Sequence, residues 1–267
     1  MNNIMKNNLS KKEIDSYMKF ASKIALGAGG ILKDGFNRPK KISYKGRIDP
    51  VTEFDLKSEK YIIDNIKRKF PAHDILSEEG SNKKSQANFR WVIDPLDGTV
   101  NFSHGFPVYS VSIALEYKNN SIAAVVYDPE RNELFSAGLN LGAYMNNKKI
   151  KVSQEKKLNR ALLATGFSYD VKTARKNNLG HFAKMVKSAQ AVRRAGSAAL
   201  DLSWLACGRI DGFWEFYLHP WDTAAAYLIV NEAGGKVTRI DGKRYSIFDN
   251  QILASNRHLH SKIAESL

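Results

Sequence analysis

The chain has 267 residues, 43% of them hydrophobic and 25% charged. This balance is ordinary for a soluble globular protein, and the length allows one large domain or two modest ones. No apolar run is long enough to cross a bilayer, so we expect no membrane segment. The single cysteine, Cys207, excludes an intrachain disulfide, which fits a reducing, cytoplasmic compartment.

The composition is strongly basic, with 41 Lys and Arg residues against 27 Asp and Glu residues and a formal net charge of +14. Such an excess raises nucleic acid as a partner. The basic residues are spread along the chain in short pairs and triplets, and no RNA- or DNA-binding motif accompanies them. We therefore predict solvated basic faces rather than a nucleic-acid groove, and a positive field that also attracts a phosphorylated substrate.

The N-terminal part predicts two helices. Residues 1–12 are rich in Asn and Lys and are expected to form a short disordered tail. A capping-box spacing at Ser10 and Glu13 then begins a long amphipathic helix, although three glycines weaken its second half. After a basic loop or short hairpin at 40–50, Thr52 can cap a second helix. Asp55 lies in its first turn, where an Asp commonly complements the helix dipole.

The most informative stretch is residues 91–102. Three apolar residues form a short buried strand, which Pro95 is expected to end, and Asp94 and Asp97 flank that proline. Gly98 then allows a backbone N–H to approach an anion closely, and Thr99 adds a hydroxyl. Asp-Pro and Asp-Gly are ordinary turn dipeptides, but two acids at one buried strand end favour a metal-bound phosphate site.

Upstream of that stretch, residues 74–77 predict a strand that ends in Glu78 and Glu79, of which one can face a site because adjacent strand side chains point to opposite faces. Downstream, an antiparallel meander is expected at 108–117, 122–127, 133–137 and 143–152. The chain divides at about residue 155, so that 1–155 carries the metal-binding motifs and 156–267 completes the site within one compact unit. The second part predicts strands at 161–166, 191–194, 210–216, 236–240 and 251–255, and helices at 177–189, 196–207, 220–233 and 258–267.

Acidic residues recur where predicted strands end or helices begin: Asp55, Glu78, Asp94, Asp97, Glu215 and Asp222. The six His residues are scattered and no Cys pair exists, which disfavours zinc or iron and favours an all-oxygen Mg²⁺ site. A Walker motif and a Gly-x-Gly-x-x-Gly motif are absent, which argues against ATP and dinucleotides.

Together these motifs resemble the inositol monophosphatase family over nearly the whole chain. The resemblance rests on Ser77-Glu78-Glu79, on residues 91–102, on Gly196-Ser197-Ala198-Ala199, and on Trp221-Asp222 followed by residues 232–235. It implies an α+β fold of five layers, α-β-α-β-α, shared with fructose-1,6-bisphosphatases and usually found as a homodimer. It also implies lithium-sensitive, Mg²⁺-dependent hydrolysis of phosphomonoesters with two to three ions.

The resemblance also implies residue roles. Glu78, Asp94 and the Leu96 carbonyl would hold one Mg²⁺, while Asp94, Asp97 and Asp222 would hold a second. Glu78 would reach a third ion through water. Thr99, assisted by Asp55, would orient or deprotonate the attacking water, and the Gly98 and Thr99 N–H groups would bind phosphate. Substrate hydroxyls would be held by Asp97, Asp222, Glu215 and the turn of Gly196, Ser197 and Ala198, with Lys45 corresponding to a family lysine near the site.

The substrate remains open among three readings. Val100-Asn101-Phe102 resembles inositol monophosphatases and related fructose-1,6-bisphosphatases, and Glu215 suits a substrate rich in hydroxyls. The first choice is myo-inositol-1-phosphate or a closely related polyol phosphate, and the second is a sugar bisphosphate. The third reading is a protein that binds the transcription or ribosome-assembly machinery, as some bacterial relatives do.

Overall fold

The structure is a computed structural model that describes residues 9–44, 50–80, 87–168, 171–172 and 177–267. Residues 1–8 of the tail expected at 1–12, and Lys45, lie outside the described residues. The expected tail is wrong at its end, because Ser10 caps a helix that begins at Lys11. Among the helices that are described, none is long and apolar enough to cross a membrane.

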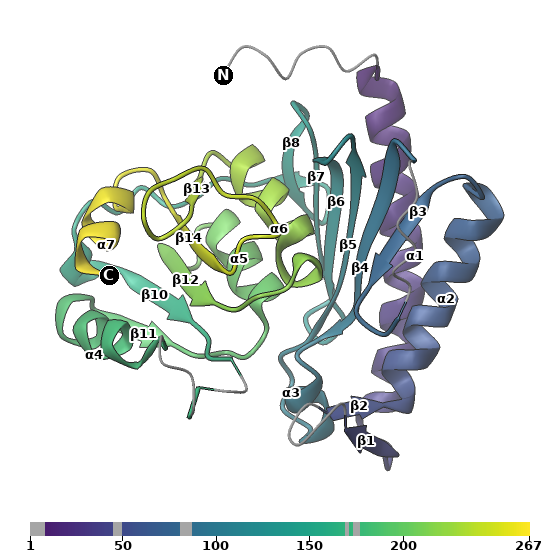
Figure 1. Cartoon of the computed structure of the whole chain (residues 1–267), viewed down its shortest axis with the longest axis horizontal. Helices are drawn as coiled ribbons and strands as arrows, with labels where there is room; N and C mark the ends of the chain where they lie inside the picture. Colours follow the sequence, from purple (N-terminus) through teal and green to yellow (C-terminus); the bar gives the residue numbers. More distant parts are fainter. Residues whose placement is uncertain (1–8, 45–49, 81–86, 169–170, 173–176) are drawn as a thin grey trace.

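Five layers of alternating helices and sheets stack against one another (Figure 1). Helices α1 (Lys11–Phe36) and α2 (Glu53–Lys69) cover one face of a seven-stranded sheet. Helices α5 (Ala198–Ala206) and α6 (Pro220–Glu232) lie between that sheet and a five-stranded sheet. Helices α4 (Leu179–Ser188) and α7 (His260–Ser266) cover the outer face. The predicted α-β-α-β-α architecture is confirmed.

The seven-stranded sheet has the order β3-β4-β5-β6-β7-β8-β9. Its β3–β4 pair is parallel, and every later pair is antiparallel, so the predicted meander is confirmed. The strands are β3 (Asp74–Ser77), β4 (Phe89–Asp97), β5 (Ser110–Tyr117), β6 (Asn120–Asp128), β7 (Glu133–Gly138), β8 (Gly142–Met145) and β9 (Lys148–Lys149). The parallel pairing brings the carboxyl ends of β3 and β4, with their acids, to the same edge.

The five-stranded sheet has the order β11-β10-β12-β14-β13. Strand β10 runs parallel to β11 and to β12, whereas β14 runs antiparallel to β12 and β13. The strands are β10 (Leu162–Thr165), β11 (Ala191–Arg193), β12 (Gly212–Phe216), β13 (Lys236–Thr238) and β14 (Gln251–Ser255). Smaller elements are the hairpin of β1 (Ile42–Tyr44) and β2 (Pro50–Thr52), and the short helix α3 (Thr99–Ser103).

Both predicted helix starts are correct. Ser10 and Glu13 form a reciprocal capping box, and Thr52 and Asp55 form a second one at the start of α2. Helix α1 continues to Phe36 despite its glycines. A Cβ on Gly27 would lie 2.2 Å from the Tyr61 hydroxyl oxygen, so this glycine allows the two helices to approach closely.

The expectation that Pro95 ends the central strand is wrong. Strand β4 continues to Asp97, with a register shift after Asp94: Asp94 lies opposite Ser112, and Asp97 lies opposite Ser110. A proline has no N–H to donate, and a bulge in a sheet tolerates it because the ladder is already interrupted there. The irregularity lies between Asp94 and Asp97, so both carboxylates lie near the same end of the sheet.

Candidate active site

A cleft of about 650 Å³ opens where the ends of β4 and β12 meet the starts of α3, α5 and α6. Of the predicted site residues that the structure describes, all except Asp55 line it, although they are far apart in the sequence. The lining therefore includes Glu78, Asp94, Leu96, Asp97, Gly98, Thr99, Gly196, Ser197, Ala198, Glu215 and Asp222.

Asp55 lies behind Thr99 rather than in the cleft wall. The Thr99 hydroxyl is 2.9 Å from Asp55 Oδ1 and 3.0 Å from the carbonyl oxygen of Leu96. The backbone N–H and hydroxyl of Thr52 donate to Asp55 Oδ2 at 2.8 and 2.5 Å. Burial raises the pKa of Asp55, against the opposing effect of the hydrogen bonds from Thr52 and Thr99. The helix cap thus also fixes a carboxylate that contacts the Thr99 hydroxyl.

Asp94 is a buried carboxylate of β4 whose pKa is raised. It is 2% exposed, and its Oδ1 accepts the Leu96 N–H at 3.0 Å. Its pKa lies well above the ordinary value because of burial, with further contributions from the charges of Glu78, Asp97 and Asp222. The charges of three other carboxylates therefore act on Asp94.

Asp97 is held by the second part of the chain. The Ser197 hydroxyl and the Ala199 N–H both donate to Asp97 Oδ2, at 2.6 and 2.8 Å. Burial raises the pKa of Asp97 to about 6, although these two donors and Ala198 act in the opposite direction.

Glu215 lies on β12 and is buried at the far wall of the cleft. Burial raises its pKa well above the usual value, with smaller contributions from Asp201, Asp222 and Asp97. A Cβ on Gly166 would lie 2.1 Å from Glu215 Oε1, so the carboxylate occupies the space that a side chain at position 166 would take. This close packing fixes the direction in which Glu215 points.

Asp222 is the third residue of α6, a helix that begins with Pro220. Its Oδ2 accepts the His219 N–H at 2.7 Å, which completes the helix cap. Glu78 follows β3, and its N–H donates to the Ile93 carbonyl at 3.3 Å, which ties it to the neighbouring strand. Helix caps and strand pairing therefore bring acids from distant segments to one place.

Two charged lining residues, Asp201 and Arg194, were missed from the sequence. Asp201 is 2% exposed, and its Oδ1 has no hydrogen-bond partner among the described residues. Burial, followed by the charge of Asp97, raises its pKa well above the usual value, while Arg194 acts in the opposite direction. An acid inside the mostly apolar run 198–206 was the available signal for Asp201. Nothing local distinguished Arg194 from Arg193.

The donor set fits Mg²⁺ in its chemistry. It consists of carboxylates and a backbone carbonyl, the hard oxygen donors that Mg²⁺ prefers. The electrostatic interaction of Asp94 with Glu78, Asp97 and Asp222 is unfavourable without a cation. Among the described residues, no three His, Cys, Asp or Glu side chains form a ready-made metal cluster. Bound cations would have to bring these carboxylates together.

Gly98 allows the tight passage from β4 into α3. Its φ is +96°, and a Cβ would lie 2.9 Å from the Val108 carbonyl oxygen. A side chain at this position would therefore be strained as well as crowded. The glycine leaves the backbone of Gly98 and Thr99 exposed to the cleft that both residues line.

Comparison with known proteins agrees with this geometry. The chain is 42% identical over 260 residues to inositol-1-monophosphatase of Synechocystis sp., with 97% of this chain and 91% of that protein covered. It is 40% identical to the Nus factor SuhB of Salmonella typhimurium, with 90% and 91% covered. The solved structure of inositol monophosphatase from Anabaena (Nostoc) sp. superposes with a TM-score of 0.86 at 38% identity, and covers 95% of each chain.

The model of the inositol monophosphatase family matches residues 13–267. This match includes both sheets and every residue named above as lining the cleft. The chain therefore belongs to the inositol monophosphatase family, a phosphatase family.

Proposed function

We propose that the protein is a Mg²⁺-dependent phosphomonoesterase that hydrolyses myo-inositol-1-phosphate or a closely related polyol phosphate. The observation that carries the proposal is the convergence of Glu78, Asp94, Asp97 and Asp222 on one cleft, beside the Asp55–Thr99 hydrogen bond. Phosphate monoesters hydrolyse extremely slowly without catalysis, so such a site must supply strong charge stabilisation.

The proposed metal ligands are Glu78, Asp94, the Leu96 carbonyl, Asp97 and Asp222, which would hold two to three Mg²⁺ ions. Bound Mg²⁺ would polarise the phosphoryl oxygens, lower the pKa of water and stabilise the leaving alkoxide. The Thr99 hydroxyl has one proton, which is shared with Asp55, so the Leu96 carbonyl, 3.0 Å from the Thr99 oxygen, retains a lone pair for an ion.

Proton transfer is assigned to Thr99 and Asp55. The Thr99 oxygen accepts a proton from the attacking water as its own proton moves to Asp55 Oδ1, 2.9 Å away. The raised pKa of Asp55 suits a group that receives a proton. The Gly98 and Thr99 N–H groups are proposed to bind the phosphate, which the open backbone at Gly98 allows.

The rest of the cleft favours a polyol over a bisphosphate. Glu215, Asp97, Asp222 and the turn of Gly196, Ser197 and Ala198 offer acceptors and backbone groups to hydroxyls. Among the described lining residues, Arg194 is the one Lys or Arg side chain available to a second phosphate. A sugar bisphosphate is therefore the second choice.

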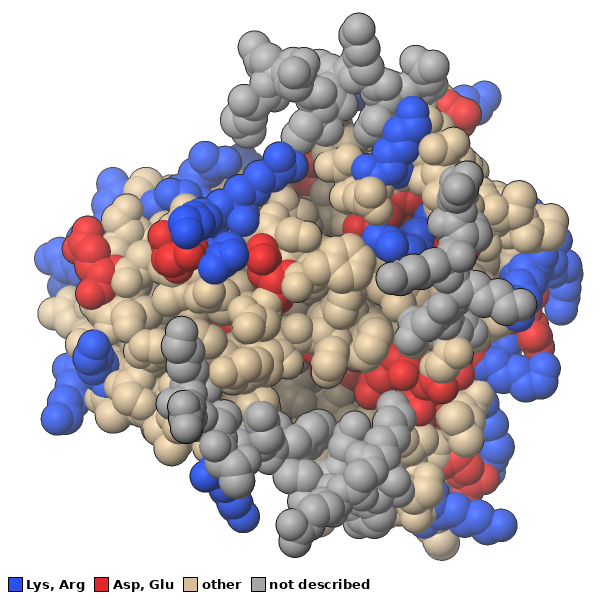
Figure 2. All heavy atoms as spheres, in the orientation of Figure 1, with Lys and Arg blue, Asp and Glu red and all other residues tan. Residues whose placement is uncertain are grey.

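The third hypothesis, a transcription-associated binding protein, draws on the similarity to the Nus factor SuhB. On the face in Figure 2, the Lys and Arg side chains form several separate groups, the largest at the upper left, and Asp and Glu side chains lie between them. The described basic residues on that face therefore form no continuous surface, so we rank this hypothesis below the enzyme.

The test is phosphate release with Mg²⁺ from three substrates: myo-inositol-1-phosphate, fructose-1,6-bisphosphate and phosphoadenosine phosphate. We expect the highest kcat/KM for the first. A higher value for fructose-1,6-bisphosphate, lost in Arg194→Gln, would favour the bisphosphatase. No turnover on any of the three would favour the binding protein.

A further inference from the structure

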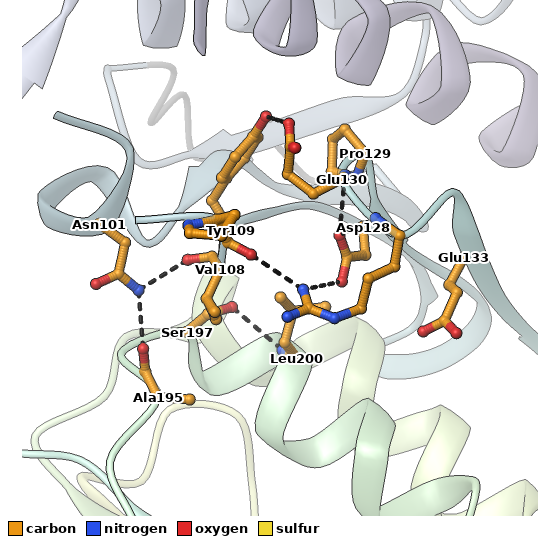
Figure 3. A network of polar contacts seen from close by, with 12 residues as sticks. Asn101, Val108, Tyr109, Asp128, Pro129, Glu130, Glu133, Ala195, Ser197 and Leu200 are labelled. Atoms are coloured by element: carbon orange, nitrogen blue, oxygen red, sulfur yellow. Dashed lines mark hydrogen bonds and ion pairs between the residues drawn. The ribbon is translucent and has the colours of Figure 1, made fainter. Parts of the chain in front are cut away.

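Asn101 joins two turns that lie far apart in the chain. Its side-chain amide nitrogen donates to the Val108 carbonyl at 2.7 Å and to the Ala195 carbonyl at 2.8 Å, as Figure 3 shows. A longer contact of 3.4 Å reaches the Gly196 carbonyl. The residue is 9% exposed and lies on α3, directly after Thr99 and Val100. The amide thus connects the segment before β5 to the turn that precedes α5.

The position requires an amide in this orientation. An asparagine side chain has two N–H donors, and here both have a carbonyl partner at short distance. An aspartate has the same shape, but its oxygen would face the carbonyl oxygens of Val108 and Ala195 and would be repelled by them. A change of one atom type therefore converts attraction into repulsion at this junction.

The backbones around Asn101 lie too close together for larger residues. A Cβ on Gly196 would lie 3.0 Å from the Asn101 amide nitrogen, and a Cβ on Gly98 would lie 3.3 Å from the Gly196 carbonyl oxygen. Both glycines have positive φ values, +87° and +96°. A small displacement of the Gly196 turn would consequently change its distance from the Asp97–Thr99 turn.

One partner of Asn101 is firmly anchored. Arg131 donates to the Pro107 carbonyl at 3.0 Å, next to Val108, and to Asp128 Oδ2 at 2.9 Å. Asp128 is fully buried at the end of β6. This network fixes the segment before β5 to the seven-stranded sheet, so the Asn101 amide positions the Ala195 side of the junction against a fixed support.

A second link crosses the same junction in the opposite direction. Ser197 and Ala199, which follow Ala195, donate to Asp97 Oδ2 at 2.6 and 2.8 Å. Asn101 is a donor toward the second turn, whereas Asp97 is an acceptor from it. The orientation of the Asp97 carboxylate therefore depends on where the Asn101 amide holds the turn.

We propose that Asn101 is a positioning residue, which holds the Ala195–Ser197 turn so that Asp97 keeps the orientation needed to bind Mg²⁺; this rests on the proposed function, in which Asp97 is a metal ligand. Loss of the amide frees the turn and rotates the Asp97 carboxylate. The defect appears in Mg²⁺ affinity and in kcat more than in KM, because the Asn101 amide donates to carbonyls of the chain.

The experiment compares the full-length wild type with Asn101→Asp, Asn101→Ala and Asn256→Asp. The alanine variant removes the donors without adding repulsion, and water from the cleft can reach the freed carbonyls. Asn256 is the matched control because its buried amide also joins two segments, with bonds of 2.7 Å to Ser153 Oγ and 3.0 Å to the Glu155 carbonyl, and it does not line the cleft. Calorimetric titration with Mg²⁺ gives Kd, thermal melts with EDTA and with Mg²⁺ give Tm, and phosphate release gives kcat and KM.

Both Asn101 variants are expected to bind Mg²⁺ at least about tenfold more weakly, as is usual when a group that orients a metal ligand is lost. Their kcat should fall by a larger factor than their KM changes. Asn256→Asp should lower Tm in EDTA and keep the wild-type Mg²⁺ Kd and kcat. Asn101 variants that lose Tm but keep Mg²⁺ affinity and kcat would overturn the positioning role alone. A wild type that neither binds Mg²⁺ nor releases phosphate would overturn the proposed function and this inference with it.

Discussion

Replacing Thr99 with valine tests the proton-transfer role with almost no change in shape. The substitution removes the hydroxyl that lies 2.9 Å from Asp55 Oδ1 and leaves the two hydrogen bonds from Thr52 in place. A hydrogen bond to a charged group contributes about 1.5–3 kcal/mol, so the free energy of unfolding should fall by about that amount. A positioned proton acceptor contributes about 10²–10⁴-fold to rate, so kcat should fall within this range while KM stays close to the wild-type value.

The assay measures kcat and KM for phosphate release at saturating Mg²⁺, together with urea unfolding. Thr99→Ser keeps the hydroxyl and should keep most of the activity. Thr238→Val is the stability control, because Thr238 is buried, donates to the Arg239 carbonyl at 2.7 Å and lies outside the cleft. It should lose stability and retain kcat. If Thr99→Val kept the kcat of the wild type, the assignment of water activation to Thr99 and Asp55 would be refuted.

Three further predictions concern stability. Mg²⁺ should raise Tm relative to EDTA because it relieves the repulsion around Asp94, and identical melts would contradict this. Gly98→Ala should cost at least about 1 kcal/mol in urea unfolding, because an L-residue is strained at positive φ, and its Cβ would lie 2.9 Å from the Val108 carbonyl oxygen; an unchanged midpoint would argue against this packing. Burial lowers the pKa of His260 from 6.5 to about 4, so the unfolded chain binds a proton that the folded chain does not. The contribution of this group to the free energy of unfolding is complete above pH 6.5 and declines toward pH 4. His260→Gln should make the free energy of unfolding, measured by urea at several pH values in this range, depend less on pH. Equal pH dependence in the variant and the wild type would contradict the prediction.

The local elements were predictable because their signals are local. Capping boxes at Ser10 and Thr52 and the alternating pattern of the meander depend on neighbours a few residues away. Pro95 misled the strand prediction because a bulge in the partner register, which only the folded sheet shows, accommodates it. Element type was therefore easier to predict than the end of the central strand.

The site was predicted mainly through the family resemblance, which pointed to acids on both sides of the cleft. Composition and spacing alone could not pair Asp97 with Ser197, since that contact spans 100 residues and depends on how two sheets pack. Asp55 illustrates a residue with two uses, because it caps α2 and also contacts Thr99. Asp201 was missed because its run was interpreted as apolar core.

The most direct test of the account is Mg²⁺-dependent phosphate release from myo-inositol-1-phosphate by the wild type and by Asp94→Asn. Asp94 is the carboxylate on which the charges of Glu78, Asp97 and Asp222 act, so its loss should affect the metal site most. The account predicts turnover that EDTA abolishes in the wild type and that Asp94→Asn lacks, while the variant remains folded by circular dichroism. Turnover that persists in EDTA, or a variant with wild-type kcat and Mg²⁺ dependence, would contradict it.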